Sequence, residues 1–168
     1  MNVITKEVAS EYFGHDDGVL FWKKSTGPRA IVGKKIQTLS SHGYVTLEFM
    51  GKSYKAHQII FLLHHGYIPT EIDHINNVRS DNRIENLRPA SRSMNCANQS
   101  TQKRSASGYK GVTKLERLNK WRARIKHLRS EIYLGLFDTA EAAAEAYNKK
   151  AAELFGSFAK PNQIGELK

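Results

Sequence analysis

The chain has 168 residues and carries 26 Lys and Arg against 16 Asp and Glu, a formal net charge of +10. No apolar run approaches the roughly 18 residues of a membrane span, and the N-terminus lacks the basic-then-apolar layout of a signal peptide, so we expect no membrane partner and a cytoplasmic location. Because Cys96 is the single cysteine, internal disulfides and cysteine-built zinc sites are excluded.

The positive charge is concentrated toward the C-terminus. Residues 1–99 hold 12 Lys and Arg against 9 Asp and Glu, whereas residues 100–168 hold 14 against 7. Within residues 101–129 ten basic side chains face one acid, Glu116. Such a density of positive charge favours a polyanionic partner, and nucleic acid is the leading candidate. The alternative is a basic surface that only aids solubility. A membrane-surface helix is disfavoured because the stretch lacks a 3.6-residue period.

In chain order, the first half predicts strands followed by short helices. Residues 19–60 are rich in β-branched and aromatic side chains, with a hairpin turn at Gly51. Residues 57–65 show helical spacing that ends at Gly66. Residues 68–83 predict a loop or a tight ribbon, and a second helix is expected at residues 91–99.

Residues 98–108, polar and without period, predict a linker, after which the second half predicts a small sheet and one helix. Three short strands are expected over residues 109–137. The alternation in "WRARIK" puts Trp121, Ala123 and Ile125 on one face and Arg122, Arg124 and Lys126 on the other. A helix with Asp138 or Thr139 as its N-cap and Gly156 as its terminator should follow. Its packed face is rich in alanine and comprises Ala143, Ala144, Tyr147, Ala151 and Leu154.

The motifs "GYKGVTK", "NKWRARIK" and "YLGLFDTAEAAAEAYNKKAAELFGSFAKPN" make residues 108–162 similar to the plant ethylene-response-factor (Apetala) DNA-binding domain. The resemblance implies a three-stranded antiparallel sheet backed by one helix, with the open face of the sheet in the DNA major groove. The plant target sequence is not transferred, because Thr113 and Leu115 stand where plant members usually have Arg. The matched DNA-contacting positions are Lys110, Trp121, Arg124, Lys126 and Tyr133.

Arg122 joins this DNA-binding set through the strand alternation. For Trp121, core packing is the open alternative to DNA contact. For the three basic strand residues, the alternative is a merely solvated face.

Four polar landmarks stand out in the first half: Asp73, His74, Asn86 and Asn95. Carboxylate and amide oxygens are hard ligands suited to Mg²⁺, and a neutral imidazole beside them is suited to act as a general base. Hydrolysis of a phosphodiester needs both functions. The alternative is a turn rich in Asp and Asn with no catalytic role.

The segments "AHQIIFLLHHG", "IDHINN" and "RSDNRIENLR", followed by Asn95, resemble the HNH endonuclease family in its phage and intron-homing branch. The resemblance covers residues 17–99 and implies a ββα-metal active site. It implies that Asp73 and Asn95 bind the metal, that His74 is the general base, and that Asn86 braces the loop that aims His74. Asparagine in place of the final His argues for Mg²⁺ or Mn²⁺ and against zinc.

Two further polar residues receive accessory roles. His57 matches a recurrent family position and is expected to pack or brace, while Asn98 is a candidate DNA contact. The other histidines belong to no constellation.

The expected fold class is α+β, with an HNH nuclease domain over residues 1–99, a linker over 100–107 and an Apetala-type domain over 108–168. The expected function is metal-dependent, phage-type cleavage of double-stranded DNA, as a monomer that nicks and needs no small-molecule cofactor. A non-cleaving DNA-binding transcriptional regulator that retains the HNH fold is the alternative. RNA binding is weaker, because the basic strand suits the major groove of B-DNA better than that of A-form RNA.

Overall fold

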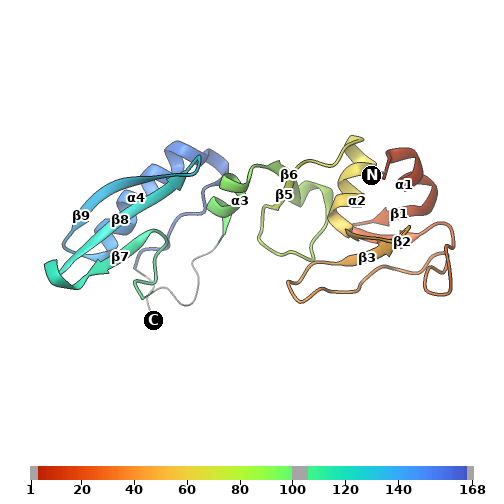
Figure 1. The fold of residues 1–168 in the computed structure, drawn as a ribbon, viewed down its shortest axis with the longest axis horizontal. Helices are drawn as coiled ribbons and strands as arrows, with labels where there is room; N and C mark the ends of the chain where they lie inside the picture. The colour runs from red at the N-terminus through yellow and green to blue at the C-terminus, as the bar shows by residue number, and fades with distance from the viewer. Residues whose placement is uncertain (1–3, 100–105, 166–168) are drawn as a thin grey trace. The chain divides into compact units, whose positions relative to one another are not determined.

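The computed structural model describes residues 4–99 and 106–165 (Figure 1). It divides into two compact units, Met1–Ala90 and Ser91–Lys168, called here the N-terminal and the C-terminal unit. Residues 91–99, the last nine of the predicted nuclease domain, belong to the C-terminal unit, because the helix at residues 92–98 packs within that unit. Residues 100–105 of the predicted linker lie outside the described residues. The functional boundaries stay a prediction.

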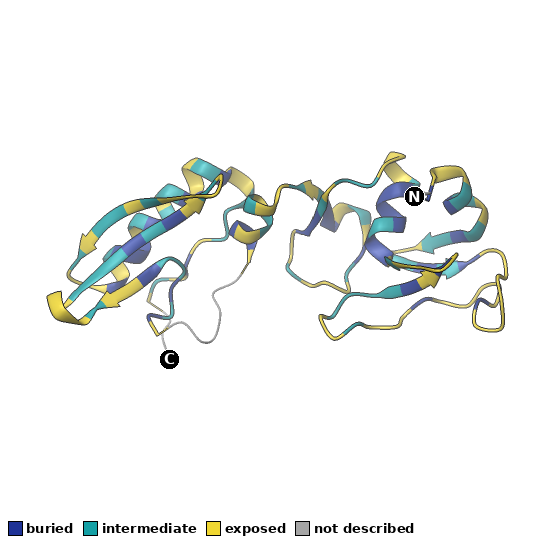
Figure 2. Cartoon of the chain, viewed as in Figure 1, coloured by how far each residue is buried: buried dark blue, intermediate teal, exposed yellow. Residues whose placement is uncertain are grey.

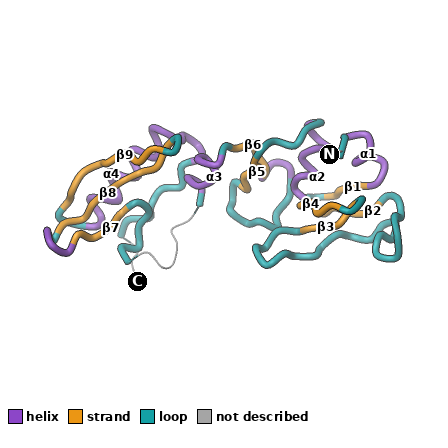
Figure 3. Tube along the Cα trace, viewed as in Figure 1, coloured by secondary structure: helices purple, strands orange, loops and turns teal. Residues whose placement is uncertain are grey.

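The N-terminal unit consists of short helices and three antiparallel hairpins (Figure 3). Its elements are α1 (Lys6–Tyr12), β1 (Phe13–Asp16), β2 (Val19–Trp22), β3 (Thr46–Phe49), β4 (Lys52–Lys55), α2 (Ala56–His65), β5 (Glu71–His74), the 3₁₀ turn η1 (Ile84–Asn86) and β6 (Leu87–Ala90). The hairpins pair β1 with β2, β3 with β4, and β5 with β6. The last pair confirms the predicted ribbon around the Asp-His dipeptide.

The strands expected within residues 19–60 are confirmed as β2, β3 and β4. Residues 23–45, between β2 and β3, form no strand. That segment is loop with two isolated bridges, Phe21 to Lys35 and Leu39 to Val45. The β-branched residues there, such as Ile31 and Val32, are exposed and have no neighbouring strand to pack against. Helix α1 was not predicted; it is seven residues long and buries only Ala9, so its apolar period is too short to detect.

The predicted turn and helix end are confirmed. Met50 and Gly51 both have positive φ, 49° and 73°, in the β3–β4 turn, as tight two-residue hairpins require. Gly66 closes α2 in the left-handed region, and its N–H donates to the Leu62 carbonyl at 2.8 Å.

The core of the N-terminal unit combines α2 with an aromatic cluster from the first hairpins. Phe13 lies 4.9 Å from Trp22 and 5.0 Å from Phe49 between ring centroids. Ile59 and Ile60 of α2 are fully buried in the same cluster. Figure 2 shows buried residues, in dark blue, along α2. This core supports the hairpin that carries Asp73 and His74.

The C-terminal unit is a three-stranded antiparallel sheet covered on one face by a helix (Figure 1). Its elements are α3 (Arg92–Asn98), β7 (Val112–Leu115), the 3₁₀ turn η2 (Glu116–Leu118), β8 (Lys120–His127), β9 (Ser130–Phe137), α4 (Ala140–Phe155) and the 3₁₀ turn η3 (Gly156–Phe158). The three strands, the long helix and the α+β class are as predicted. Thr139, rather than Asp138, caps α4 by accepting from the Ala142 N–H at 3.1 Å.

Small residues allow α4 to lie close to the sheet. Ala143 and Ala144 are completely buried against Ala123 of β8. Gly111 has φ of 71°, and a Cβ there would lie 2.3 Å from both the Arg124 carbonyl oxygen and the Tyr147 ring. Only glycine fits at this approach.

Of the helices in the described ranges, none combines the length and apolar character needed to cross a membrane.

Candidate active site and nucleic-acid interface

The β5–β6 hairpin presents Asp73 and His74 side by side at the end of β5. Asp73 pairs with Arg88 across the hairpin, and His74 pairs with Leu87. Both side chains are buried, with exposed fractions of 3% and 5%. Burial of a carboxylate and an imidazole requires compensating partners.

Asp73 finds its compensation in Arg88. The Nε and a terminal nitrogen of that guanidinium both donate to Oδ2 of Asp73 at 2.8 Å. The guanidinium gives the buried carboxylate charged hydrogen-bond partners and fixes its orientation.

His74 is held through its ring. Its Nε2 lies 3.1 Å from the Oδ1 of Asn82, which is itself buried. Burial lowers the pKa of His74, while the Asn82 contact and Asp73 act in the opposite direction. A lowered pKa keeps the imidazole neutral at neutral pH, which is the form that can accept a proton.

His57 and Tyr44 enclose the His74 ring. His57 stands edge-to-face with His74 at 4.9 Å between centroids, and Tyr44 lies 5.4 Å from His57 and 6.0 Å from His74. Burial, together with the charges of His74 and Lys55, lowers the pKa of His57 to about 3. His57 is therefore neutral at physiological pH and packs against His74, and its accessory role stays a prediction.

Asn86 makes several hydrogen bonds within the loop between the two strands. Its Oδ1 accepts from the Asn76 backbone N–H at 3.0 Å, and its Nδ2 donates to the Asn76 side chain and to the Asp81 carbonyl at 3.0 and 2.7 Å. Asp81 is further held by Arg83 at 2.8 and 2.9 Å. These bonds make the loop after His74 a cross-linked unit.

Asn82 lies in the segment predicted as a loop or a tight ribbon, and the structure shows it contacting the candidate base. In sequence it is one of several asparagines in a polar run, and no spacing rule separates it from Asn76 or Asn77. Its exposed fraction of 2% distinguishes it, and burial is a property of the fold.

Asn95 and Asn98 lie on α3, in the C-terminal unit. Asn95 is partly buried in the middle of the helix, where its backbone N–H donates to the Ser91 carbonyl at 2.9 Å. Asn98 is buried at the C-terminal end. Their roles as metal ligand and DNA contact stay predictions.

The predicted ligand atoms are of the chemical type that a hard divalent cation prefers. A carboxylate oxygen of Asp73 and an amide oxygen of Asn95 are ligands that Mg²⁺ accepts, with water and phosphate oxygens completing its shell. Within residues 4–99 and 106–165, no group of three or more His, Cys, Asp or Glu gathers that could hold a metal ion.

The open face of the C-terminal sheet carries most of the predicted DNA-binding residues. Arg122 pairs with Thr113 and Leu136, Arg124 with Tyr133, and Lys126 with Glu131. Tyr133 is 62% exposed. Arg124 donates to Glu131 at 2.9 Å, an exposed ion pair that contributes little to stability and can be exchanged for a phosphate.

Lys110 and Trp121 do not share this face. The Lys110 ammonium donates to the carbonyl oxygens of Ala97, Gln99 and Lys160, and burial with the Lys160 charge lowers its pKa to about 8. Trp121 packs, partly buried, against the alanine-rich cluster beneath the sheet. Trp121 thus lies where the core-packing alternative placed it. Lys110 links α3 to the loop before β7.

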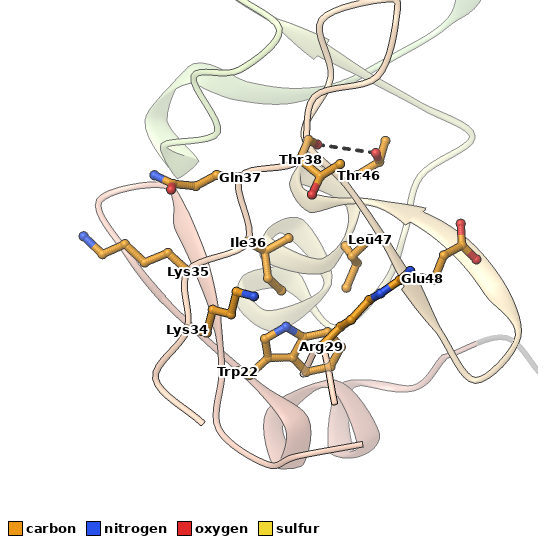
Figure 4. A pocket seen from close by; sticks show the side chains of 10 residues that line it. All are labelled: Trp22, Arg29, Lys34, Lys35, Ile36, Gln37, Thr38, Thr46, Leu47 and Glu48. Atoms are coloured by element: carbon orange, nitrogen blue, oxygen red, sulfur yellow. Dashed lines mark hydrogen bonds between the residues drawn. The ribbon is translucent and has the colours of Figure 1, made fainter. Parts of the chain in front are cut away.

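A second basic feature lies in the N-terminal unit, away from the candidate catalytic residues. A pocket of about 380 Å³ has Trp22, Ile36 and Leu47 among its walls (Figure 4). Three basic side chains also line it, Arg29, Lys34 and Lys35, with Glu48 as the one acid. Residues 18–70 hold seven Lys and Arg against that single acid. The near balance of charge over residues 1–99 hides this local excess of basic residues.

Two comparisons relate the chain to known HNH endonucleases. The HNH endonuclease family model matches residues 54–97. An uncharacterised HNH endonuclease of Acanthamoeba polyphaga mimivirus is 36% identical over 137 residues, covering 80% of this chain and 70% of the viral protein.

The C-terminal segment has separate relatives. The AP2-like ethylene-responsive transcription factors TOE2 and ANT of Arabidopsis thaliana are 41% and 43% identical over 59 and 61 residues, each match covering 35% of this chain. The matches span only 12% and 11% of the plant proteins. No solved structure matches the chain. From the hairpin that carries Asp73 and His74 and from the viral relative that spans most of its length, the chain belongs to the HNH endonuclease family, with an AP2-like segment at its C-terminal end.

Proposed function

We propose that the protein is a metal-dependent endonuclease that hydrolyses phosphodiester bonds of double-stranded DNA. The observation that carries the proposal is the buried His74 imidazole, kept neutral by its surroundings and placed next to the Asp73 carboxylate. A neutral base beside a hard anionic ligand is the minimum apparatus for activating water against a phosphate.

His74 accepts the proton of the attacking water. Its ring is held by Asn82 and packed by His57, so the base is oriented before DNA arrives. Asn86 keeps the loop that contains Asn82 in one conformation through Asn76 and Asp81. This preorganisation lowers the cost of reaching the reactive geometry.

Asp73 and, by the family resemblance, Asn95 hold the divalent cation, Mg²⁺ or Mn²⁺. When bound, the cation neutralises charge on the scissile phosphate and on the departing oxygen. Arg88 orients the Asp73 carboxylate through two contacts to Oδ2.

The C-terminal unit anchors the enzyme on DNA. Arg122, Arg124 and Lys126 lie on one sheet face with exposed Tyr133, and basic strands of this kind suit the wide major groove of B-DNA. The enzyme acts as a monomer that nicks one strand, because the catalytic motif occurs once per chain and one such site handles one phosphodiester at a time. A phage or mobile-intron origin agrees with this arrangement.

Plasmid cleavage tests the proposal. Supercoiled plasmid is incubated with the protein, once with Mg²⁺ and once with a chelator, and the topoisomers are separated on a gel. We expect cutting with Mg²⁺ and none with the chelator. Activity that survives complete chelation contradicts the metal requirement.

A matched pair of histidine variants locates the base. His74→Ala should lower the single-turnover rate roughly 10²-fold or more, the usual contribution of a general base, with DNA affinity unchanged. His65→Ala removes an exposed histidine of α2 outside the site and should cut at the wild-type rate. If the wild type binds DNA but cuts no substrate under any metal condition, the non-cleaving regulator is the better description.

A further inference from the structure

The side chain of Asn82 contacts the ring of His74 from the β5–β6 loop. It is 2% exposed, and its Oδ1 lies 3.1 Å from Nε2 of His74. A buried amide oxygen that faces a ring nitrogen of the candidate base can determine which nitrogen of that ring carries the proton.

The orientation of the Asn82 amide follows from its other bond. Its Nδ2 donates to the Ser80 carbonyl at 3.3 Å, and a carbonyl oxygen can only accept. This assigns the amino group to the Ser80 side and the oxygen to the His74 side. Because the Asn82 oxygen can only accept as well, the Nε2 of His74 must carry the proton of that bond. In the neutral ring the lone pair is then on Nδ1.

Asn82 is itself held by its backbone. A Cβ added at Gly18 would lie 2.4 Å from the Arg83 nitrogen and 2.7 Å from the Asn82 carbonyl carbon, so the β1–β2 turn rests directly on the Asn82–Arg83 peptide. On the other side, Asn86 donates to the Asp81 carbonyl at 2.7 Å. Two elements far apart in sequence therefore fix the position of the amide.

We propose that Asn82 is a positioning residue that sets the Nε2–H tautomer of His74, so that Nδ1 is the atom that takes the proton from the attacking water. The catalytic part of this statement rests on the proposed function, whereas the tautomer is a property of the folded protein with or without activity. Asn86 acts through the loop backbone, and His57 acts through ring packing. Asn82 is the side chain that bonds His74 through its oxygen.

Two substitutions separate the hydrogen bond from the shape of the site. Asn82→Asp keeps an acceptor oxygen toward His74 and loses the donor toward Ser80. Asn82→Leu has similar size and loses both. The thermal melting temperature of each variant shows whether it folds.

The first measurement is ¹⁵N NMR of the full-length protein with labelled histidine, at a pH of about 8.5 where histidine rings are neutral. His74→Gln assigns the His74 signals among the seven histidines of the chain. We expect the Nε2–H tautomer in the wild type and in Asn82→Asp, and a mixture or the Nδ1–H tautomer in Asn82→Leu. A wild-type protein with the proton on Nδ1 overturns the inference, even if no variant folds.

The second measurement is the nicking rate at saturating DNA. Asn82→Leu should lose roughly 10- to 100-fold in kcat, the usual effect of removing the partner that orients an active-site imidazole, with KM unchanged. Asn82→Asp should recover most of this loss. Full activity together with the Nε2–H tautomer in Asn82→Leu contradicts the role. If the wild-type protein cuts no DNA, the proposed function fails, and the NMR result still decides the tautomer.

Discussion

His57 makes the stability of the N-terminal unit depend on pH in a way that can be calculated. In the folded protein its pKa is lowered to about 3 from an ordinary 6.5, first by burial and then by the charges of His74 and Lys55. The unfolded chain therefore gains a proton on this ring as the pH falls through about 6.5, while the folded chain does not. Stability is fully present above pH 6.5 and is lost progressively down to about pH 3.

The size of the effect follows from the same two values. Each pH unit inside the interval costs about 1.4 kcal/mol, so His57 alone should remove about 2 kcal/mol of unfolding free energy between pH 7 and pH 5. The matched variant is His57→Phe, which cannot titrate and keeps an aromatic ring between Tyr44 and His74. Carboxylates and His74 titrate in both proteins, so their contributions cancel in the comparison to a first approximation.

The assay is urea unfolding at pH 7 and pH 5, followed by the fluorescence of Trp22, which lies in the core of this unit. A Trp121→Phe background removes the other tryptophan signal. We expect the wild type to lose about 2 kcal/mol more than His57→Phe between the two pH values. Equal losses in the two proteins refute the reasoning, because they mean that folding does not hold His57 neutral.

Three further outcomes are expected. The double variant Arg124→Gln, Lys126→Gln should reduce the slope of log K for DNA binding against log salt by about 2, the contribution of two phosphate contacts. Its single-turnover rate at saturating DNA should be unchanged, and a slower rate means that these residues do more than bind. A fragment of residues 104–168 should melt at a lower temperature than one of residues 91–168, since it lacks Ala97 and Gln99, whose carbonyls accept from Lys110; equal melting temperatures contradict the structural role of α3. Supercoiled plasmid should pass through an accumulating open circle, from a protein that sediments near its chain mass of 19.0 kDa; linear product formed directly by a stable dimer excludes nicking by a monomer.

Local signals in the amino-acid sequence determined the elements of the fold that depend on neighbours in the chain. The alternation in β8, the glycine ends of α2 and α4 and the turn at Gly51 were all readable, because each depends on periodicity or on a positive φ. The order of Asp73, His74 and Asn86 was also readable, because it matches the spacing of the HNH endonuclease family. Strand β5 carries Asp73 and His74, and the catalytic roles of these residues stay predictions.

Tertiary packing decided what no local signal records. Lys110 has the charge of a DNA contact, yet its ammonium is held by carbonyls from two distant segments. The sequence left open whether Trp121 contacts DNA or packs in the core, and in the structure it packs against the alanine-rich cluster. Asn82 is buried against His74. Gly18, more than sixty residues earlier in the chain, allows the β1–β2 turn to approach the Asn82–Arg83 peptide closely. Burial and long-range approach are properties of the folded chain, so the residue that orients the base became visible only in three dimensions.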